Sequence, residues 1–319
     1  MAPGRSRPIL VTGTHRSGST WVGRVIAAHP GVVYISEPFN WDQNFGRSPV
    51  RYWFHHVTPH EEKAFDAYLR PQLEFRTRWW QTFRERPTPR QAAVATWRKL
   101  RGAWRRRTGA RPLVKDPIAL FSAPWLARTY DADVVVLIRH PAAFVNSLKR
   151  LGWDFGFHHL LRQPALLAGM LVPFADRIAR YTAEPPDLVD QAILLWRIFH
   201  HVIRRYQQEH PGWLFVRHED LSLDPQEGFA RLLGRLGLAM TSEVVHEVEL
   251  YSAPDNPAET AGRVVQQLLL DSRQNVWSWK RRLSALEIAR IRRGTEDVSR
   301  HFYSADDWTG PADELRHSA

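Results

Sequence analysis

The chain has 319 residues, 44% of them hydrophobic, and a formal net charge of +11. These values are typical of an ordinary soluble globular protein with a substantial core. Cysteine is absent, which excludes disulfides and thiolate metal sites and makes the cytoplasm the expected location.

Apolar runs in this sequence are short. The longest, residues 165–175, falls well below the roughly 20 residues that a bilayer-crossing helix needs. The apolar stretch near the N-terminus, residues 8–11, is too short for the core of an export signal. We therefore expect neither a membrane-spanning helix nor export.

The positive charge is concentrated in residues 70–111, where 13 Arg and Lys residues face only two Glu. The net charge of this segment, +11, equals that of the whole chain. Four tryptophans are interleaved with it: Trp79, Trp80, Trp97 and Trp104. Such a stripe suits an anionic glycan, nucleic acid or an anionic membrane surface, which would make the protein peripheral to a membrane. The alternative is a solvated pair of basic helices.

Strand and helix patterns alternate along the chain. Residues 8–13 form a β-branched run that ends in glycine and precedes a helical pattern at 20–29. A second strand is expected at 32–35, and Pro38 biases Glu37 towards an extended conformation at its end. Further strands are expected at 113–115, 133–138 and 213–216, and the last two are followed by helical patterns.

This alternation predicts a single α/β domain over residues 1–319, with a P-loop-like, doubly wound parallel sheet flanked by helices. The continuous apolar run at 133–138 suits a strand buried on both faces. Residues 41–112 lack strand character and are rich in Arg, Trp and Pro. We interpret them as a mostly helical inserted cap on the acceptor side.

The loop at residues 13–20 has the G-x-x-x-x-G spacing of a phosphate-binding loop, directly after a strand and before a helix. Its glycines let backbone N–H groups converge on an anion, and the helix N-terminus adds positive partial charge. A nucleoside triphosphatase would have lysine where Ser19 stands. It would also have a magnesium-binding aspartate where strand 133–138 ends in Arg139. These departures weaken the alternative of a P-loop small-molecule kinase.

The same loop resembles the 5'-phosphosulfate loop of the sulfotransferase superfamily, in particular its Golgi-type carbohydrate and bacterial branches. The match covers residues 14–21, with Arg16 where cytosolic relatives have lysine. Arg139, His140 and Pro141, followed by Ser147 eight residues after Arg139, resemble the family's 3'-phosphate motif. An arginine at a strand end and a serine two helical turns later can grip one phosphate.

The resemblance implies a co-substrate, 3'-phosphoadenosine 5'-phosphosulfate (PAPS), and a product, 3'-phosphoadenosine 5'-phosphate (PAP), with no metal. Trp21 aligns with a tryptophan that stacks on adenine. The implied donor-binding residues are Arg16, Ser17, Gly18, Ser19, Thr20, Trp21, Arg139 and Ser147.

Two later segments resemble the family more weakly. Residues 215–221 resemble a Y-E-D-L segment near the adenine, with His218 in place of tyrosine, so an adenine contact and a structural histidine both remain open. Residues 275–283 resemble a W-[KR]-x-x-L element, to which we assign no role.

The resemblance also implies the catalytic groups. Glu37 stands where Golgi-type and bacterial relatives carry a catalytic glutamate, which makes it the expected general base. The alternative is a structural carboxylate paired with an arginine. Arg16 and Lys115 are expected to stabilise charge, with a surface lysine as the alternative for Lys115, and Asp116 is a reserve base.

The expected acceptor is a hydroxyl of a carbohydrate or glycolipid, since tryptophan and arginine in the 41–112 region suit sugar rings and anionic groups. Adjacent histidine pairs such as His158 and His159 point in different directions, so no metal site is expected. A different class of function is a nucleic-acid-binding module that uses the basic 70–111 segment. Such a module does not explain Arg139 and Ser147.

Overall fold

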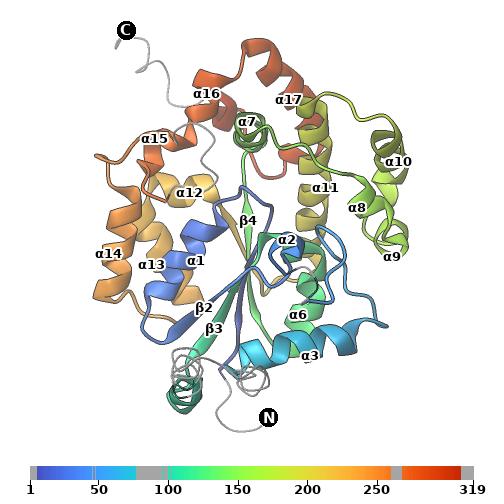
Figure 1. Cartoon of the computed structure of the whole chain (residues 1–319). Coiled ribbons are helices and arrows are strands. Elements are labelled where there is room, and N and C mark those ends of the chain that lie inside the picture. Colours follow the sequence, from blue (N-terminus) through green and yellow to red (C-terminus); the bar gives the residue numbers. More distant parts are fainter. Residues whose placement is uncertain are drawn as a thin grey trace.

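The computed structural model describes residues 6–44, 46, 48–76, 96, 100, 102–259 and 268–309. Its centre is a sheet of five parallel strands in the order β2-β3-β1-β4-β5 (Figure 1). The strands are β1 (Ile9–Thr12), β2 (Val32–Ser36), β3 (Arg111–Lys115), β4 (Asp133–Ile138) and β5 (Leu214–Arg217). The expected α/β parallel sheet is therefore confirmed.

Both faces of the sheet are buried. Successive residues of a strand point to opposite faces. In β4, accordingly, Val134 and Val136 belong to one hydrophobic core, while Val135 and Leu137 belong to the other. This two-sided burial explains why the strand reads as an uninterrupted apolar run.

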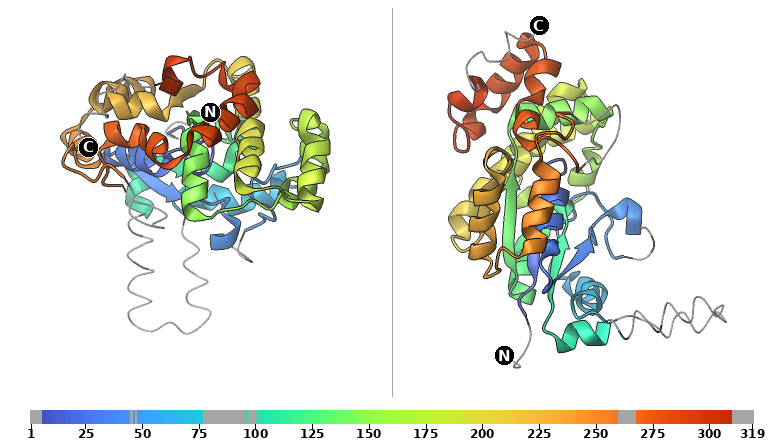
Figure 2. Two further views of the ribbon diagram at one scale, coloured as in Figure 1. Left: turned by 90° about the horizontal axis from the view of Figure 1, so that it is seen from above. Right: turned by 90° about the vertical axis from the view of Figure 1, so that its left-hand side faces the viewer.

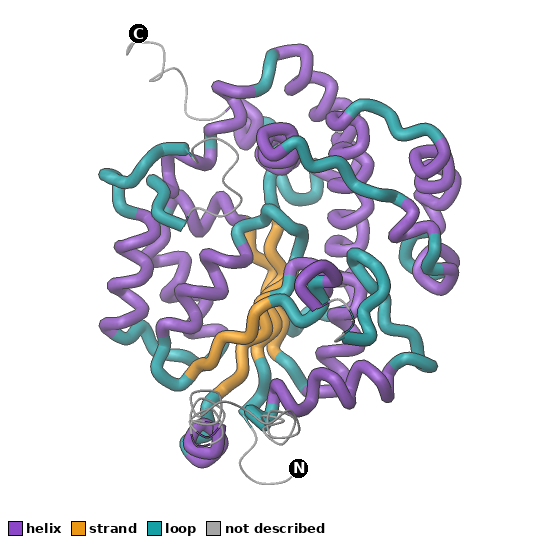
Figure 3. Tube along the Cα trace, viewed as in Figure 1, coloured by secondary structure: helices purple, strands orange, loops and turns teal. Residues whose placement is uncertain are grey.

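Helices cover each face, as the purple helices around the orange strands in Figure 3 show. The core on one face is completed by α1 (Ser19–Ala28), α13 (Pro225–Arg235) and α14 (Ser242–Ser252). The core on the other face includes α3 (Glu62–Leu73), α6 (Ala123–Tyr130), α7 (Pro141–Leu151), α11 (Leu188–Glu209) and α17 (Ala285–Ser299). The sheet is doubly wound, as the sequence predicts.

Shorter helices complete the described chain. They are α2 (Trp41–Asn44), η1 (Pro117–Ser122), α8 (His158–Leu161), α9 (Pro164–Ala168), η2 (Val172–Phe174), α10 (Ala175–Ala183), α12 (His218–Leu223), α15 (Ser272–Val276), α16 (Ser278–Arg282) and α18 (Asp306–Thr309). Among the helices that the structure describes, none has both the length and the apolar character required to cross a membrane.

The predicted insertion at residues 41–112 extends too far at its C-terminal end. Its described part contains α2, α3 and a helical stretch at residues 102–107, but β3 already begins at Arg111. Arg111 and Pro112 pair with Val32 and Val33 of β2, so the sheet takes up the last residues assigned to the insertion. Residues 77–95, 97–99 and 101, with three of the four tryptophans, lie outside the described residues.

The basic helical stretch lies at the end of the sheet opposite the anion loop. The chain enters β3 from residues 102–107, so this stretch lies at the amino ends of the parallel strands (Figure 2). Its Trp104 is 61% exposed. The expectation that all of 41–112 caps the acceptor side is therefore wrong for this part, because the anion loop follows the carboxyl end of β1.

Candidate active site

The chain leaves the carboxyl ends of all five strands at one edge of the sheet. Gly13 follows β1, Glu37 follows β2, Asp116 follows β3, Arg139 follows β4 and His218 follows β5. Here the connections from β1 and from β3 lead to opposite sides of β1, which is the switch point where α/β sheets bind ligands. A cavity of about 620 Å³ opens at this edge.

Two glycines shape the loop between β1 and α1. A Cβ on Gly13 would lie 2.5 Å from the carbonyl oxygen of Leu137, so only glycine lets β1 end this close to β4. Gly18 has a φ of 87° and caps α1, whose first residues Ser19 and Thr20 line the cavity. The positive end of the helix dipole therefore faces the cavity, as an anion site requires.

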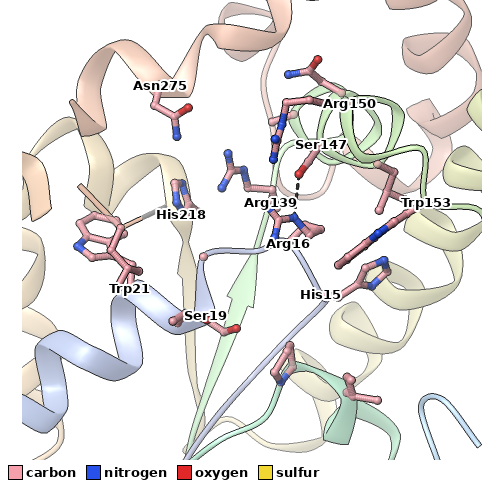
Figure 4. A pocket seen from close by; sticks show the side chains of 18 of the residues that line it. His15, Arg16, Ser19, Trp21, Arg139, Ser147, Arg150, Trp153, His218 and Asn275 are labelled. Atoms are coloured by element: carbon pink, nitrogen blue, oxygen red, sulfur yellow. Dashed lines mark hydrogen bonds between the residues drawn. The ribbon is translucent and has the colours of Figure 1, made fainter. Parts of the chain in front are cut away.

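Arginines gather beside this loop. Arg16, Arg139 and Arg150 line the cavity and lie together near Ser147 in Figure 4. The Nε of Arg16 donates a hydrogen bond to the Ser147 hydroxyl at 2.9 Å. Arg282, from α16, lines the same cavity.

The arginines repel one another. Burial, together with the charges of Arg150 and Arg139, lowers the pKa of Arg16 to about 10. Burial and the charge of Arg282 also lower the pKa of Arg150. A bound anion would relieve this repulsion by favouring the charged guanidinium groups.

An aromatic pair forms another part of the cavity wall. The rings of Trp21 and His218 lie 5.5 Å apart, and both residues line the cavity. The His218 ring also packs against Gly18, and its Nδ1 is 3.1 Å from the hydroxyl of Ser222. Burial first, and then the charge of Arg139, lower the pKa of His218 well below 6.5, so the ring is neutral. His218 thus packs as a structural histidine and also faces the cavity.

Glu37 lies on the cavity wall with both carboxylate oxygens engaged. The Lys115 ammonium contacts Oε1, and the Asn40 side-chain amide donates to Oε2 at 2.7 Å. Glu37 has a φ of 46°, a left-handed conformation that is unusual for a non-glycine residue, so the expectation of an extended Glu37 is wrong. The chain turns sharply here instead, at the end of β2. The carboxylate is therefore fixed by a lysine rather than by an arginine.

The other two candidate residues, Lys115 and Asp116, do not line the cavity. Lys115 is only 1% exposed, which rules out a surface lysine. The Asp116 carboxylate accepts backbone hydrogen bonds from Phe39 at 2.6 Å and Ile118 at 3.0 Å. Burial raises the pKa of Asp116 to about 7. These contacts make Asp116 the cap of η1.

The wall beside Glu37 is aromatic and polar. The Trp53 backbone N–H donates to Nδ1 of His159 at 3.4 Å, and both residues line the cavity with Trp153 and Phe155. The polar groups of this part are Asn40, Asp42, Gln43 and Asp154.

Most of the sequence-predicted donor residues meet at this cavity: Arg16, Gly18, Ser19, Thr20, Trp21, Arg139 and Ser147. Ser17 differs, because its buried hydroxyl donates to the Thr14 carbonyl at 2.6 Å and so closes the loop. Sequence reasoning missed Arg150, although it follows Ser147 by three residues on α7 and therefore shares its helix face.

Histidines and carboxylates do not assemble into a metal site in the described part of the chain, where no three of them are suitably placed. His15 lines the cavity but packs between Phe54 and Phe144, and burial lowers its pKa to about 3.

Comparison with solved structures finds distant similarity to sulfotransferases. The sulfotransferase domain of the Synechococcus PCC 7002 olefin synthase is 16% identical, with a TM-score of 0.48 and coverage of 95% of this chain and 98% of that chain. Mouse sulfotransferase SULT7A1 complexed with PAP is 14% identical, with a TM-score of 0.45 and coverage of 99% and 90%. Sulfotransferase STF9 from Mycobacterium avium is 15% identical, with a TM-score of 0.43 and coverage of 94% and 78%.

No curated protein sequence matches the chain significantly. The model of the sulfotransferase family matches residues 8–242, which include β1 to β5 and every strand end described above. The chain therefore belongs to the sulfotransferase family, and its reaction is the transfer of a sulfuryl group.

Proposed function

We propose that the protein transfers the sulfuryl group of PAPS to a hydroxyl of a carbohydrate or glycolipid, without a metal and with Glu37 as general base. The observation that carries the donor assignment is the gathering of Arg16, Arg139 and Arg150 on one cavity, where burial and neighbouring arginines lower the pKa values of Arg16 and Arg150. Such a group binds strongly anionic ligands through charge-assisted hydrogen bonds.

The cavity offers a partner for each part of this donor. Gly18, Ser19 and Thr20 suit the 5'-phosphosulfate, while Arg139 and Ser147 suit the 3'-phosphate. Trp21 and His218 supply an aromatic wall for the adenine ring. A cavity of about 620 Å³ also lies within the usual range for small-molecule sites.

In the proposed reaction the acceptor oxygen attacks sulfur while the bond from sulfur to the 5'-phosphate oxygen breaks. PAP leaves with the electron pair of that bond, and the acceptor proton passes to Glu37. Arg16, at the anion loop, would stabilise the charge that develops on the leaving group. Alignment and charge stabilisation are the main requirements of such a transfer.

The contacts of Glu37 suit a base. A carboxylate oxygen has more than one lone-pair site, so the contacts with Lys115 and Asn40 leave room for an acceptor hydroxyl. Since Lys115 contacts Glu37 and does not line the cavity, we propose that it acts by holding Glu37. Asp116 is a poorer candidate because its oxygens accept backbone N–H groups and the residue does not line the cavity.

The aromatic and amide groups beside Glu37 support a sugar acceptor. Trp53 and Trp153 can pack on sugar rings, and Asn40 and Gln43 can hydrogen-bond hydroxyl groups. Asp42 adds negative charge, and residues 37–53 and 153–159 contribute no Lys or Arg to the described lining. We therefore favour a neutral or amine-bearing sugar over an anionic glycan.

The donor assignment is tested by calorimetry with PAP, adenosine 5'-phosphate and ATP, without magnesium. We expect PAP to bind about 100-fold more tightly than adenosine 5'-phosphate, because two or more charge-assisted hydrogen bonds to the 3'-phosphate are lost. ATP binding equal to or tighter than PAP binding would contradict the assignment and favour a kinase. Salt-sensitive binding of nucleic acid in place of PAP would favour the nucleic-acid-binding module.

The general base is tested with Glu37→Gln, with Glu227→Gln as the matched control, because the Glu227 side chain on α13 is 59% exposed. We expect Glu37→Gln to keep its affinity for PAP and to lose turnover about 100-fold or more in transfer from radiolabelled PAPS. The acceptor panel contains neutral glycans, amino sugars, glycolipids and sulfated glycans. Full turnover by Glu37→Gln would exclude Glu37 as the base.

A further inference from the structure

A buried carboxylate lies beside the proposed 3'-phosphate arginine. Glu219, at the start of α12, is 5% exposed, and its Oε1 lies 3.6 Å from Nε of Arg139. Oε1 also accepts a hydrogen bond from the backbone N–H of His140 at 2.9 Å, and Oε2 accepts one from the Tyr303 hydroxyl at 2.9 Å. Glu219 therefore has two short hydrogen bonds, but neither comes from Arg139.

Arg139 consequently has a counter-charge without a direct hydrogen bond to it. A separation of 3.6 Å is too long for a hydrogen bond. Within the described part of the chain, Nε of Arg139 is buried and has no hydrogen-bond partner. Burial lowers the pKa of Arg139, and the neighbouring Glu219 charge opposes this effect. A buried donor without a partner is costly, so this arrangement needs a reason. The Nε faces Glu219, while Arg139 also lines the cavity, where the rest of its guanidinium can meet a ligand.

We propose that Glu219 is a positioning residue that serves as the counter-ion of Arg139 until a phosphate binds. Tyr303 and the His140 N–H hold the carboxylate, so that it neutralises the guanidinium without occupying its donors. The 3'-phosphate then finds Arg139 ordered and available. This inference rests on the proposed PAPS donor.

The proposal makes the C-terminal segment part of the donor site. Tyr303 lies beyond residue 242, where the family match ends. It is 5% exposed, packs at the edge of the His140 ring, and lies beneath the Arg217 guanidinium at 4.6 Å. Arg217 in turn is paired with Asp307 of α18. These contacts fix the hydroxyl that restrains Glu219.

The test removes this hydroxyl with Tyr303→Phe. In the variant Oε2 of Glu219 is free to accept directly from Arg139, and the phosphate must then displace it. We expect the Kd for PAP to rise about tenfold, which corresponds to about 1.4 kcal/mol and so to about one hydrogen bond. The Kd for adenosine 5'-phosphate should be unchanged. In turnover the KM for PAPS rises and kcat is unchanged.

Tyr130→Phe is the matched control, because the Tyr130 hydroxyl donates to the Asp66 carboxylate at 2.9 Å at a distance from the cavity. It should leave both affinities unchanged. Equal weakening of PAP and adenosine 5'-phosphate by Tyr303→Phe would show a general structural effect and overturn the proposal. So would an unchanged Kd for PAP.

A second variant, Glu219→Gln, should not weaken PAP binding as Tyr303→Phe does. Glu219→Gln removes the competing charge but keeps an acceptor for the His140 N–H, so PAP should bind at least as tightly as to the wild type. The ligand-free variant should unfold at a lower temperature, because the buried Arg139 charge is then uncompensated. Tenfold weaker PAP binding by Glu219→Gln would overturn the counter-ion role. If the wild type itself does not prefer PAP over adenosine 5'-phosphate, the proposed donor fails instead.

Discussion

Gly18→Ala tests whether the anion loop depends on contact between glycine and His218. Gly18 has a φ of 87°, and a Cβ built on it would lie 2.2 Å from Cδ2 and 2.7 Å from Nε2 of the His218 ring. The ring cannot move freely, because His218 is 6% exposed and its Nδ1 is held by Ser222. The substitution therefore combines backbone strain with a steric clash.

The two effects can be separated in magnitude. A left-handed backbone costs a non-glycine residue about 1 kcal/mol, and forcing an extra methyl group into a packed site costs about 2 kcal/mol. We expect Gly18→Ala to lower the free energy of unfolding by about 3 kcal/mol in total. Gly237→Ala is the control, because Gly237 has a φ of 69° and nothing within 4 Å of its Cβ position. It should lose only about 1 kcal/mol.

Urea denaturation measures the loss of unfolding free energy in both variants. The slope of this free energy against urea concentration should be the same as in the wild type. In a His218→Ala background the clash is absent, so adding Gly18→Ala should cost only about 1 kcal/mol. A Gly18→Ala variant no less stable than Gly237→Ala would refute the clash. A loss that persists in full in the His218→Ala background would show that the ring is not its cause.

Three further predictions concern the donor, the acceptor and pH. Arg139→Ala should weaken PAP binding about 100-fold in calorimetry and leave adenosine 5'-phosphate binding nearly unchanged. Trp53→Ala should raise the KM for the acceptor about tenfold without changing the Kd for PAP, because it removes aromatic contact area only. Burial lowers the pKa values of His140 and His200 from 6.5 to about 3. Since the unfolded chain takes up these protons below about pH 6.5 and the folded chain does not, the free energy of unfolding should fall as pH is lowered from 7 to 5, and His200→Phe should reduce the slope by about one proton.

Local patterns predicted much of the fold. The run at 133–138 gives β4 its full length because a strand buried on both faces is apolar at every buried position, here the five residues after Asp133. The expected position of Glu37 after β2 is confirmed by the structure. Arg139 and Ser147 could be placed together because a strand end and the next helical turns are close along the chain.

Contacts between distant segments could not be predicted in the same way. The charge of residues 70–111 carries no information about which end of the sheet they occupy, and this becomes clear only from the direction of β3. The contact of Lys115 with Glu37 joins residues 78 positions apart, through the pairing of β2 with β3. The contact between Glu219 and Tyr303 spans 84 positions and depends on how the C-terminal segment packs.

The surroundings of Glu37 show why its lysine partner matters for the proposed chemistry. A carboxylate that shares a cavity with four arginines can form an ion pair with one of them and then no longer accept a proton, since opposite charges in a partly buried site attract strongly. The left-handed backbone at Glu37 turns the chain at the end of β2, and Lys115 and Asn40 then engage one carboxylate oxygen each. The lysine comes from behind the cavity wall, so it can hold the base without occupying space that the donor or acceptor needs. The contacts of Glu37 described above are therefore with Lys115 and Asn40 rather than with the cavity arginines, and its carboxylate stays on the cavity wall, where an acceptor's proton can reach it.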